Sequence, residues 1–358
     1  MTAPKRTRTV IAAGYAPMDI VSYQGRVWHA AGGTAGNVAA VLGFLGWQAS
    51  LIADLGDDPA GEAVVRDLAR ANVATDAIRL RADLRTPRVV HQIDGARHKF
   101  LFRCPSCATS LPRSRPLNIE RAEQIVESAV SPDVFFFDRV NAGTLVLAEH
   151  FAKSACLVVF EPGRPANEDR LRRAMAVADV VKMAHDRPTG IESAELQASQ
   201  VQIVTLGSEG ARFRIGKGTW HVSPAFPFPI VDTGGAGDWT TAGLVHALPD
   251  HGRRTMQTVS DALRWAQALA AVSCGAPGAR GLARQQSAEA VVRTVRFMAT
   301  SQNPPTVTLK PSLRSRTKPR NGNCSWCLQQ TSIPGDRPGA TPPRRQLRTG
   351  NARREVGG

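Results

Sequence analysis

The sequence has no long apolar run and little cysteine for its length. No stretch approaches the about 20 apolar residues that a membrane-spanning helix needs, so no membrane partner is expected. Near the start, Gly14, Pro17 and Asp19 interrupt the few apolar residues that follow the first basic ones, which argues against a secretory signal peptide. Six cysteines in 358 residues do not make a dense disulfide framework. These shortages predict a cytoplasmic protein in a reducing compartment.

Aromatic residues are almost absent from residues 301–358, where Trp326 is the only one. The same segment holds 8 of the 24 prolines and 11 lysines and arginines against Asp336 and Glu355. Such a segment cannot bury enough apolar surface to offset the entropy of ordering it. We therefore predict one domain over residues 1–300 and a basic, proline-rich, disordered tail over 301–358. Basic tails can bind nucleic acid, but a solvated extension is the expected role here.

Strand and helix signals alternate along the rest of the chain. Apolar runs predict strands over 10–13 and 49–54, each followed by a helical pattern, and the alternation continues to residue 274. This order is typical of an α/β fold with a mostly parallel central sheet and helices on both faces. Residues 88–102 alternate around Asp94-Gly95, a favoured hairpin turn, which predicts a small β lid over about 86–104.

The segment Pro229–Asp238 (PIVDTGGAGD) carries the sharpest chemical signal. It predicts a strand end, a loop of small residues and the start of a helix. In such a loop, the backbone amides of Gly235, Ala236 and Gly237 can form an anion hole for a transferring phosphoryl group. Asp238 at the helix start can accept the proton of a substrate hydroxyl. Taken alone, the same residues fit a tight turn and a helix cap equally well.

A second glycine-rich segment, Gly32–Asn37 (GGTAGN), is followed by Gly56-Asp57-Asp58. With the DTGGAGD segment, these residues resemble the two signature regions of the ribokinase/PfkB carbohydrate kinase family, and the resemblance runs from about Val10 to about Gly281. It implies a ribokinase-like three-layer fold. It also implies transfer of the ATP γ-phosphoryl group to an alcohol hydroxyl of a sugar or sugar-like acceptor, with Asp238 as the base and Mg²⁺ as a cofactor.

The resemblance also assigns binding roles to individual residues. The acceptor is expected to contact Asp19, Gly32, Gly33 and Asn37. ATP is expected to contact Thr205, Gly207 and Gly210. A monovalent cation, K⁺, is expected beside the anion hole at Asp232 and Thr233.

Several features of the chain depart from the family pattern or add to it. Where the family places an Asn-x-x-Glu motif that organises Mg²⁺ through water, this chain reads Met183–Arg187 (MAHDR), and Asp186 is the predicted substitute. Glu161, at a predicted strand end, suits a salt bridge or a phosphate contact. The pairs Cys104/Cys107 and Cys324/Cys327 have the outward form of a zinc site, but their separation favours simple turns.

The sequence does not exclude two other functions. A nucleoside (adenosine-like) kinase of the same fold would need an apolar slot near the lid, which Phe100 and Phe102 can supply. A catalytically weak sugar- or nucleotide-binding regulator would explain the missing Asn-x-x-Glu motif, although a pure binder does not need Asp238. Because the family's lid often forms a dimer contact, the resemblance also implies a homodimer through the lid.

Overall fold

The computed structural model describes residues 6–301 except 95–96, 164–166, 188–195 and 250–253. The predicted tail, apart from Ser301, lies outside the described residues, as do Cys324 and Cys327.

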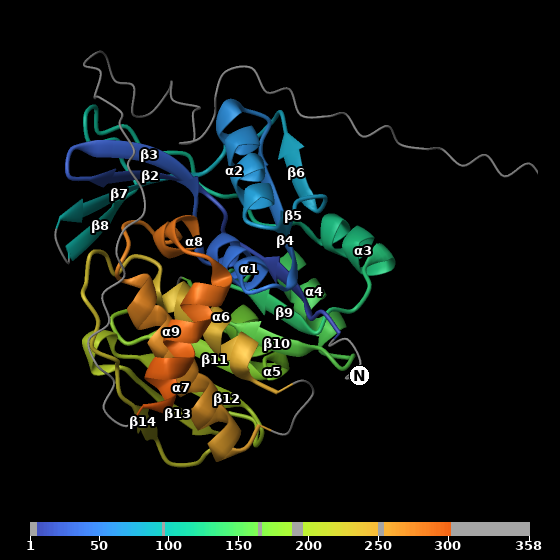
Figure 1. Cartoon of the computed structure of the whole chain (residues 1–358). Coiled ribbons are helices and arrows are strands. Elements are labelled where there is room, and N and C mark those ends of the chain that lie inside the picture. Colours follow the sequence, from blue (N-terminus) through green and yellow to red (C-terminus); the bar gives the residue numbers. More distant parts are fainter. Residues whose placement is uncertain (1–5, 95–96, 164–166, 188–195, 250–253, 302–358) are drawn as a thin grey trace, which may run out of the picture.

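A ten-stranded sheet runs through the centre of the molecule in the order β14-β13-β12-β11-β10-β9-β1-β4-β5, with β6 also paired to β4 (Figure 1). The pairs from β12 to β5 are parallel, whereas β13 and β14 add an antiparallel edge. The strands are β1 (Thr9–Ala13), β4 (Gln48–Gly56), β5 (Val73–Ala74), β6 (Ile78–Arg81), β9 (Val134–Phe137), β10 (Leu157–Phe160), β11 (Val180–Ala184), β12 (Val201–Thr205), β13 (Ala211–Ile215) and β14 (His221–Ser223).

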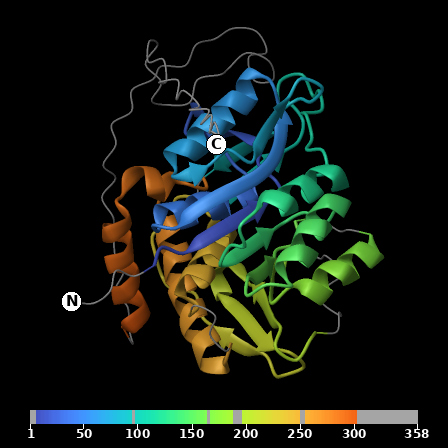
Figure 2. The same cartoon turned by 90° about the vertical axis from the view of Figure 1, so that its right-hand side faces the viewer.

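Helices cover both faces of this sheet, with the orange C-terminal helices on one side and the green ones on the other (Figure 2). The helices are α1 (Thr34–Phe44), α2 (Pro59–Arg70), α3 (Ile119–Ser128), α4 (Ala142–Phe151), α5 (Glu168–Val177), α6 (Ala236–Ala247), α7 (Met256–Ser273), α8 (Gly281–Gln285), α9 (Ala288–Thr300) and the short 3₁₀ helix η1 (Gly207–Glu209). Side chains of β9 alternate between the two cores: Phe136 packs with α1 and α6, and Phe135 and Phe137 pack with α3 and α4. The predicted α/β fold class is confirmed.

A second, four-stranded sheet lies beside the main one in the order β3-β2-β7-β8 and is called the lid sheet below (Figure 1). Its strands are β2 (Met18–Tyr23), β3 (Arg26–Ala31), β7 (Arg88–Asp94) and β8 (Arg97–Leu101). β7 and β8 pair antiparallel, with His91 opposite Phe100 and Ile93 opposite His98. His91, His98 and Phe100 therefore share one face of the lid sheet.

The structure differs from the sequence prediction at several elements. Residues 229–231 form no strand, because Pro224, Pro227 and Pro229 lack the N–H donors that a sheet edge requires. The hairpin of β2 and β3 and the helix α3 were not predicted, and Asp19 lies inside β2. Cys104 is buried and Cys107 is exposed in a turn after β8. Within the described ranges, no helix is long and apolar enough to cross a membrane.

Candidate active site

A cavity of about 990 Å³ is lined by the lid sheet and by residues at the carboxyl ends of β9, β10, β11 and β12. In parallel α/β sheets, ligands bind at this end of the strands. The cavity brings together predicted residues from distant parts of the chain, namely Asp19, Gly33, Asn37, Asp186, Thr205, Gly207, Gly210, Thr233, Gly235, Ala236, Gly237 and Asp238. Gly32 and Asp232 are not among its lining residues.

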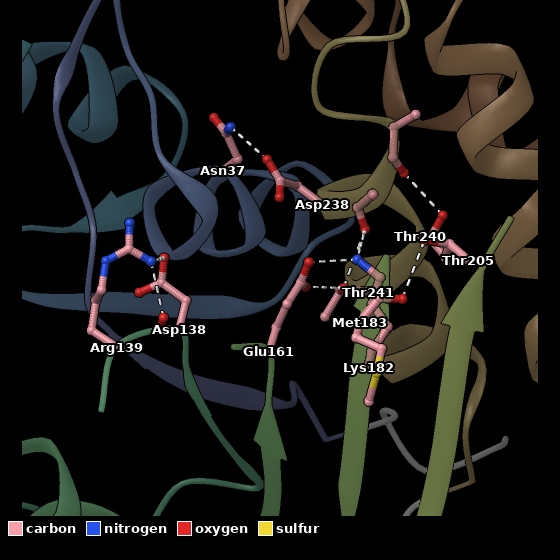
Figure 3. Close-up of polar contacts among 12 residues, drawn as sticks. Asn37, Asp138, Arg139, Glu161, Lys182, Met183, Thr205, Asp238, Thr240 and Thr241 are labelled. Carbon is pink, nitrogen blue, oxygen red and sulfur yellow. Dashed lines mark hydrogen bonds and ion pairs between the residues drawn. The ribbon is translucent and has the colours of Figure 1, made fainter. Parts of the chain in front are cut away.

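Asp238 lies in the first turn of α6 and faces the amino-terminal part of α1 (Figure 3). Its Oδ2 accepts a hydrogen bond of 2.7 Å from Nδ2 of Asn37. The pKa of Asp238 is raised to about 7, because burial and the charge of Glu161 raise it more than Lys182 lowers it. A carboxylate with a pKa near neutral pH is suited to take a proton from an alcohol.

The loop before α6 presents backbone amides to the same cavity. Gly235 has a φ of 83°, and a Cβ there would lie 2.6 Å from Cβ of Ala279, so only glycine fits. The amide of Ala236 already donates to the carbonyl of Thr233 at 3.2 Å. This leaves the amides of Gly235 and Gly237 as the donors of the predicted anion hole, at the positive end of the helix dipole.

Polar groups of β2 and α1 line the acceptor side of the cavity. Asp19 is buried, and desolvation raises its pKa to about 7, with Arg280 opposing the rise. A Cβ at Gly32 would lie 2.0 Å from Oδ2 of Asp19, so the glycine lets the strand pass close to this carboxylate. Oδ1 of Asn37 is buried and has no hydrogen-bond partner among the described residues. A buried acceptor of this kind is expected to find a partner in a bound ligand.

An ion pair between Glu161 and Lys182 lies beneath the first turn of α6, and the role of Lys182 was not predicted. The Nζ of Lys182 lies 2.6 Å from Oε1 of Glu161 and donates to the carbonyl of Gly237 at 2.9 Å (Figure 3). Thr241 donates to Oε2 of Glu161 at 2.6 Å. Glu161 therefore forms a salt bridge, one of its two predicted roles; it also lines the cavity, and the phosphate contact stays a prediction. The available signal was a lysine in the middle of the apolar run of β11, where a charge is buried only with a partner.

Residues at the carboxyl ends of β11 and β12, and in the turns after them, line another part of the cavity. Thr205 ends β12, and Gly207 and Gly210 bracket the turn after it, where the sequence predicts contacts with ATP. Asp186 is exposed and lines the cavity. Its free-standing carboxylate fits water-mediated Mg²⁺, which prefers oxygen ligands and retains water. Arg187 adds a positive charge to the same lining.

The lid sheet meets the loop before α6 at Asp232. The two carboxylate oxygens of Asp232 accept from the amides of Gly234 and Gly278, each at 2.8 Å. Two imidazoles adjoin this carboxylate, His91 at 3.8 Å and His98 at 4.0 Å. These neighbours are nitrogen donors, whereas potassium is held by cages of oxygen. The predicted K⁺ site at Asp232 and Thr233 stays a prediction, and no catalytic step below uses it.

Residues 8–286 match the family described as pfkB family carbohydrate kinase. The chain belongs to this family. It is therefore a carbohydrate kinase, a phosphotransferase that binds ATP. A fructokinase of Klebsiella pneumoniae is 27% identical over 277 residues, which cover 72% of this chain and 89% of the relative. An ATP-dependent ribose-1-phosphate kinase of Halopiger xanaduensis is 29% identical over 258 residues, covering 70% and 82%.

The fold is shared with solved sugar kinases. A fructokinase double mutant of Vibrio cholerae O395, in a form with fructose, ADP and potassium ion bound, superimposes with a TM-score of 0.64 at 19% identity. The superposition covers 81% of this chain and 98% of the other. At this identity the likeness shows the three-layer fold, which agrees with the sheet order and the two helical layers described above.

Proposed function

We propose that the protein transfers the γ-phosphoryl group of ATP to an alcohol hydroxyl of a sugar, with Asp238 as the general base. The observation that carries the proposal is the partly buried Asp238 carboxylate, which lines the cavity beside the small-residue loop at the start of α6. The hydroxyl proton passes to Asp238 as the oxygen bonds to the γ-phosphorus and the bond from phosphorus to the leaving oxygen of ADP breaks. The amides of Gly235 and Gly237 stabilise charge on the equatorial oxygens.

The acceptor and the nucleotide occupy opposite ends of the cavity in this proposal. Asp19 and Asn37 bind acceptor hydroxyls, with Gly33 letting the backbone come close to the sugar. The turn from Thr205 to Gly210 holds the phosphates and ribose of ATP. Mg²⁺, when bound, neutralises phosphate charge, and Asp186 would hold it through water.

A nucleoside is a second candidate for the acceptor. Phe100 and Phe102 of the lid side both line the cavity and are 36% and 41% exposed, so an aromatic surface is available for a base. The intact Asp238 argues against the non-catalytic regulator, because binding alone needs no base. Pairing of two chains through the lid sheet stays a prediction.

The proposal is tested by ADP release with Mg²⁺-ATP across fructose, ribose, ribose 1-phosphate, other hexoses and pentoses, and nucleosides. Acceptor-dependent ADP release together with a phosphorylated acceptor in the mass spectrum is the expected result. A sugar acceptor would establish the first candidate and a nucleoside the second. Binding of sugar or ATP without turnover by any acceptor would contradict the proposal and favour a regulator.

The rate should fall in acid because the base must be ionised. With the pKa of Asp238 raised to about 7, kcat/KM for the acceptor is expected to be level above that pH and to fall about tenfold per unit below it. Asp19, whose pKa is also about 7, steepens the fall if its ionised form binds the acceptor. The measurement is direct product detection by ³¹P NMR from about pH 5 to 9. A flat profile across this range would exclude a base with a raised pKa.

A further inference from the structure

Two imidazoles and one carboxylate gather where the lid sheet meets the loop that leads to α6. His91 comes from β7, His98 from β8 and Asp232 from the loop. One potential ligand atom from each residue lies within 4.8 Å of the others. The cluster thus joins parts of the chain that are more than 130 residues apart, and the catalytic proposal gives its histidines no role.

The distances suit a metal ion after a small closure of the lid. Nε2 of His91 lies 3.8 Å and Nδ1 of His98 lies 4.0 Å from Oδ1 of Asp232. Ligand atoms at about 2.0–2.1 Å from zinc in a tetrahedron are about 3.3–3.5 Å apart. Each of these two pairs therefore needs to close by about half an ångström, and the two imidazole nitrogens, which lie within 4.8 Å of each other, by at most about 1.5 Å.

The burial of His91 is an independent sign of a ligand. Its side chain is 1% exposed, and its Nε2 has no hydrogen-bond partner in the described part of the chain. A buried polar atom left without a partner is costly, and native proteins rarely retain one without a reason. A bound ion would satisfy this nitrogen.

The carboxylate is already held in place for such a role. The amides of Gly234 and Gly278 fix both oxygens of Asp232, and each oxygen keeps a second lone pair. Outer hydrogen bonds of this kind orient the ligands of metal sites. Thr233 contacts Nδ1 of His98 at 2.9 Å and would release it to the metal.

We propose that His91, His98 and Asp232 bind a divalent transition metal ion of the Zn²⁺ class. Imidazole nitrogen binds zinc, copper, iron and nickel ions in preference to potassium, magnesium and calcium, which prefer oxygen ligands. The ion would fasten both strands of the β7–β8 hairpin to the loop that leads to Gly235. Occupancy of this site would therefore hold the lid sheet against the phosphate-binding end of α6.

The test is Co²⁺ binding to the full chain after removal of metal with EDTA, followed by displacement with Zn²⁺. We expect one equivalent of Co²⁺ with visible ligand-field bands and no thiolate charge-transfer band. His91→Asn, His98→Asn and Asp232→Asn should each lower the affinity for Co²⁺ by at least 10- to 100-fold. Loss of a residue that only hydrogen-bonds to a metal ligand already lowers metal affinity by about this much. His221→Asn, on the exposed edge strand β14, is the matched control and should bind as the wild type.

A second measurement reports on the lid sheet directly and needs no catalytic turnover. Its result therefore does not depend on whether the proposed kinase function is correct. Zn²⁺ should raise Tm and slow amide hydrogen exchange in β7 and β8 of the wild type and of His221→Asn, but not of His91→Asn or His98→Asn. Absence of Co²⁺ binding in the wild type would overturn the site. So would equal affinity in all variants or a thiolate band, since either would place the metal elsewhere, on cysteines in the second case.

Discussion

Asp238→Asn should lower kcat by about 10²- to 10⁴-fold, the usual contribution of a general base. The amide has nearly the shape of the carboxylate, and its oxygen can still accept the hydrogen bond from Asn37. It cannot take a proton from the acceptor hydroxyl. KM for the acceptor should change little, because Asp19 and Asn37 stay in place. The measurement is steady-state ADP release with the acceptor that the panel identifies.

Stability distinguishes this loss from misfolding. Asp238 is partly buried and its pKa is raised from 3.8 to about 7, so the folding free energy that its ionisation costs grows between these pH values and is complete above about pH 7. Asp238→Asn should therefore have an unchanged or higher Tm at alkaline pH. Asp261→Asn changes an exposed carboxylate of α7 that does not line the cavity, and it should keep wild-type kcat. If Asp238→Asn kept kcat within tenfold of the wild type, the base would lie elsewhere, with Asp19 the next buried carboxylate.

The elements predicted from sequence are those with a strong local signal. β1, β9 and β10 are short runs of almost only apolar residues between turns, and α1 follows a glycine pair, so their positions needed no long-range information. β2 escaped prediction because Asp19 interrupts its apolar pattern, and its burial depends on packing within the lid sheet. The three prolines before Asp232 should have excluded the predicted strand at 229–231.

The residues of the candidate site also divide into those with a local sequence signal and those without one. Gly235 to Asp238 and Gly32 to Asn37 are contiguous, so their sequence alone could suggest that they face a ligand. The Glu161–Lys182 pair joins the end of β10 to the middle of β11, and the cluster at Asp232 joins the lid sheet to the loop before α6. No local pattern records which strands become neighbours. These groups come together only through the order of the strands within the sheets and the packing of the lid sheet on the loop before α6.

Lys182→Met should be the most destabilising of the changes considered. It leaves Glu161 buried without its partner beneath α6, and breaking a buried ion pair from one side costs about 3–5 kcal/mol of unfolding free energy. It also removes the hydrogen bond to the carbonyl of Gly237, which positions the first turn of α6. We expect kcat to fall about 100-fold, as displaced catalytic groups commonly produce. Urea unfolding and ADP release measure the two effects.

The charge of Lys182 also has a signature that packing alone would not give. Lys182 lowers and Glu161 raises the pKa of Asp238, so Lys182→Met should move the acid limb of the kcat/KM profile to higher pH. The double change Lys182→Met with Glu161→Gln removes both charges, and it should return the limb toward its wild-type position and recover part of the lost stability. An acid limb that stayed in place in Lys182→Met would show that the lysine supports α6 mechanically and does not tune the base.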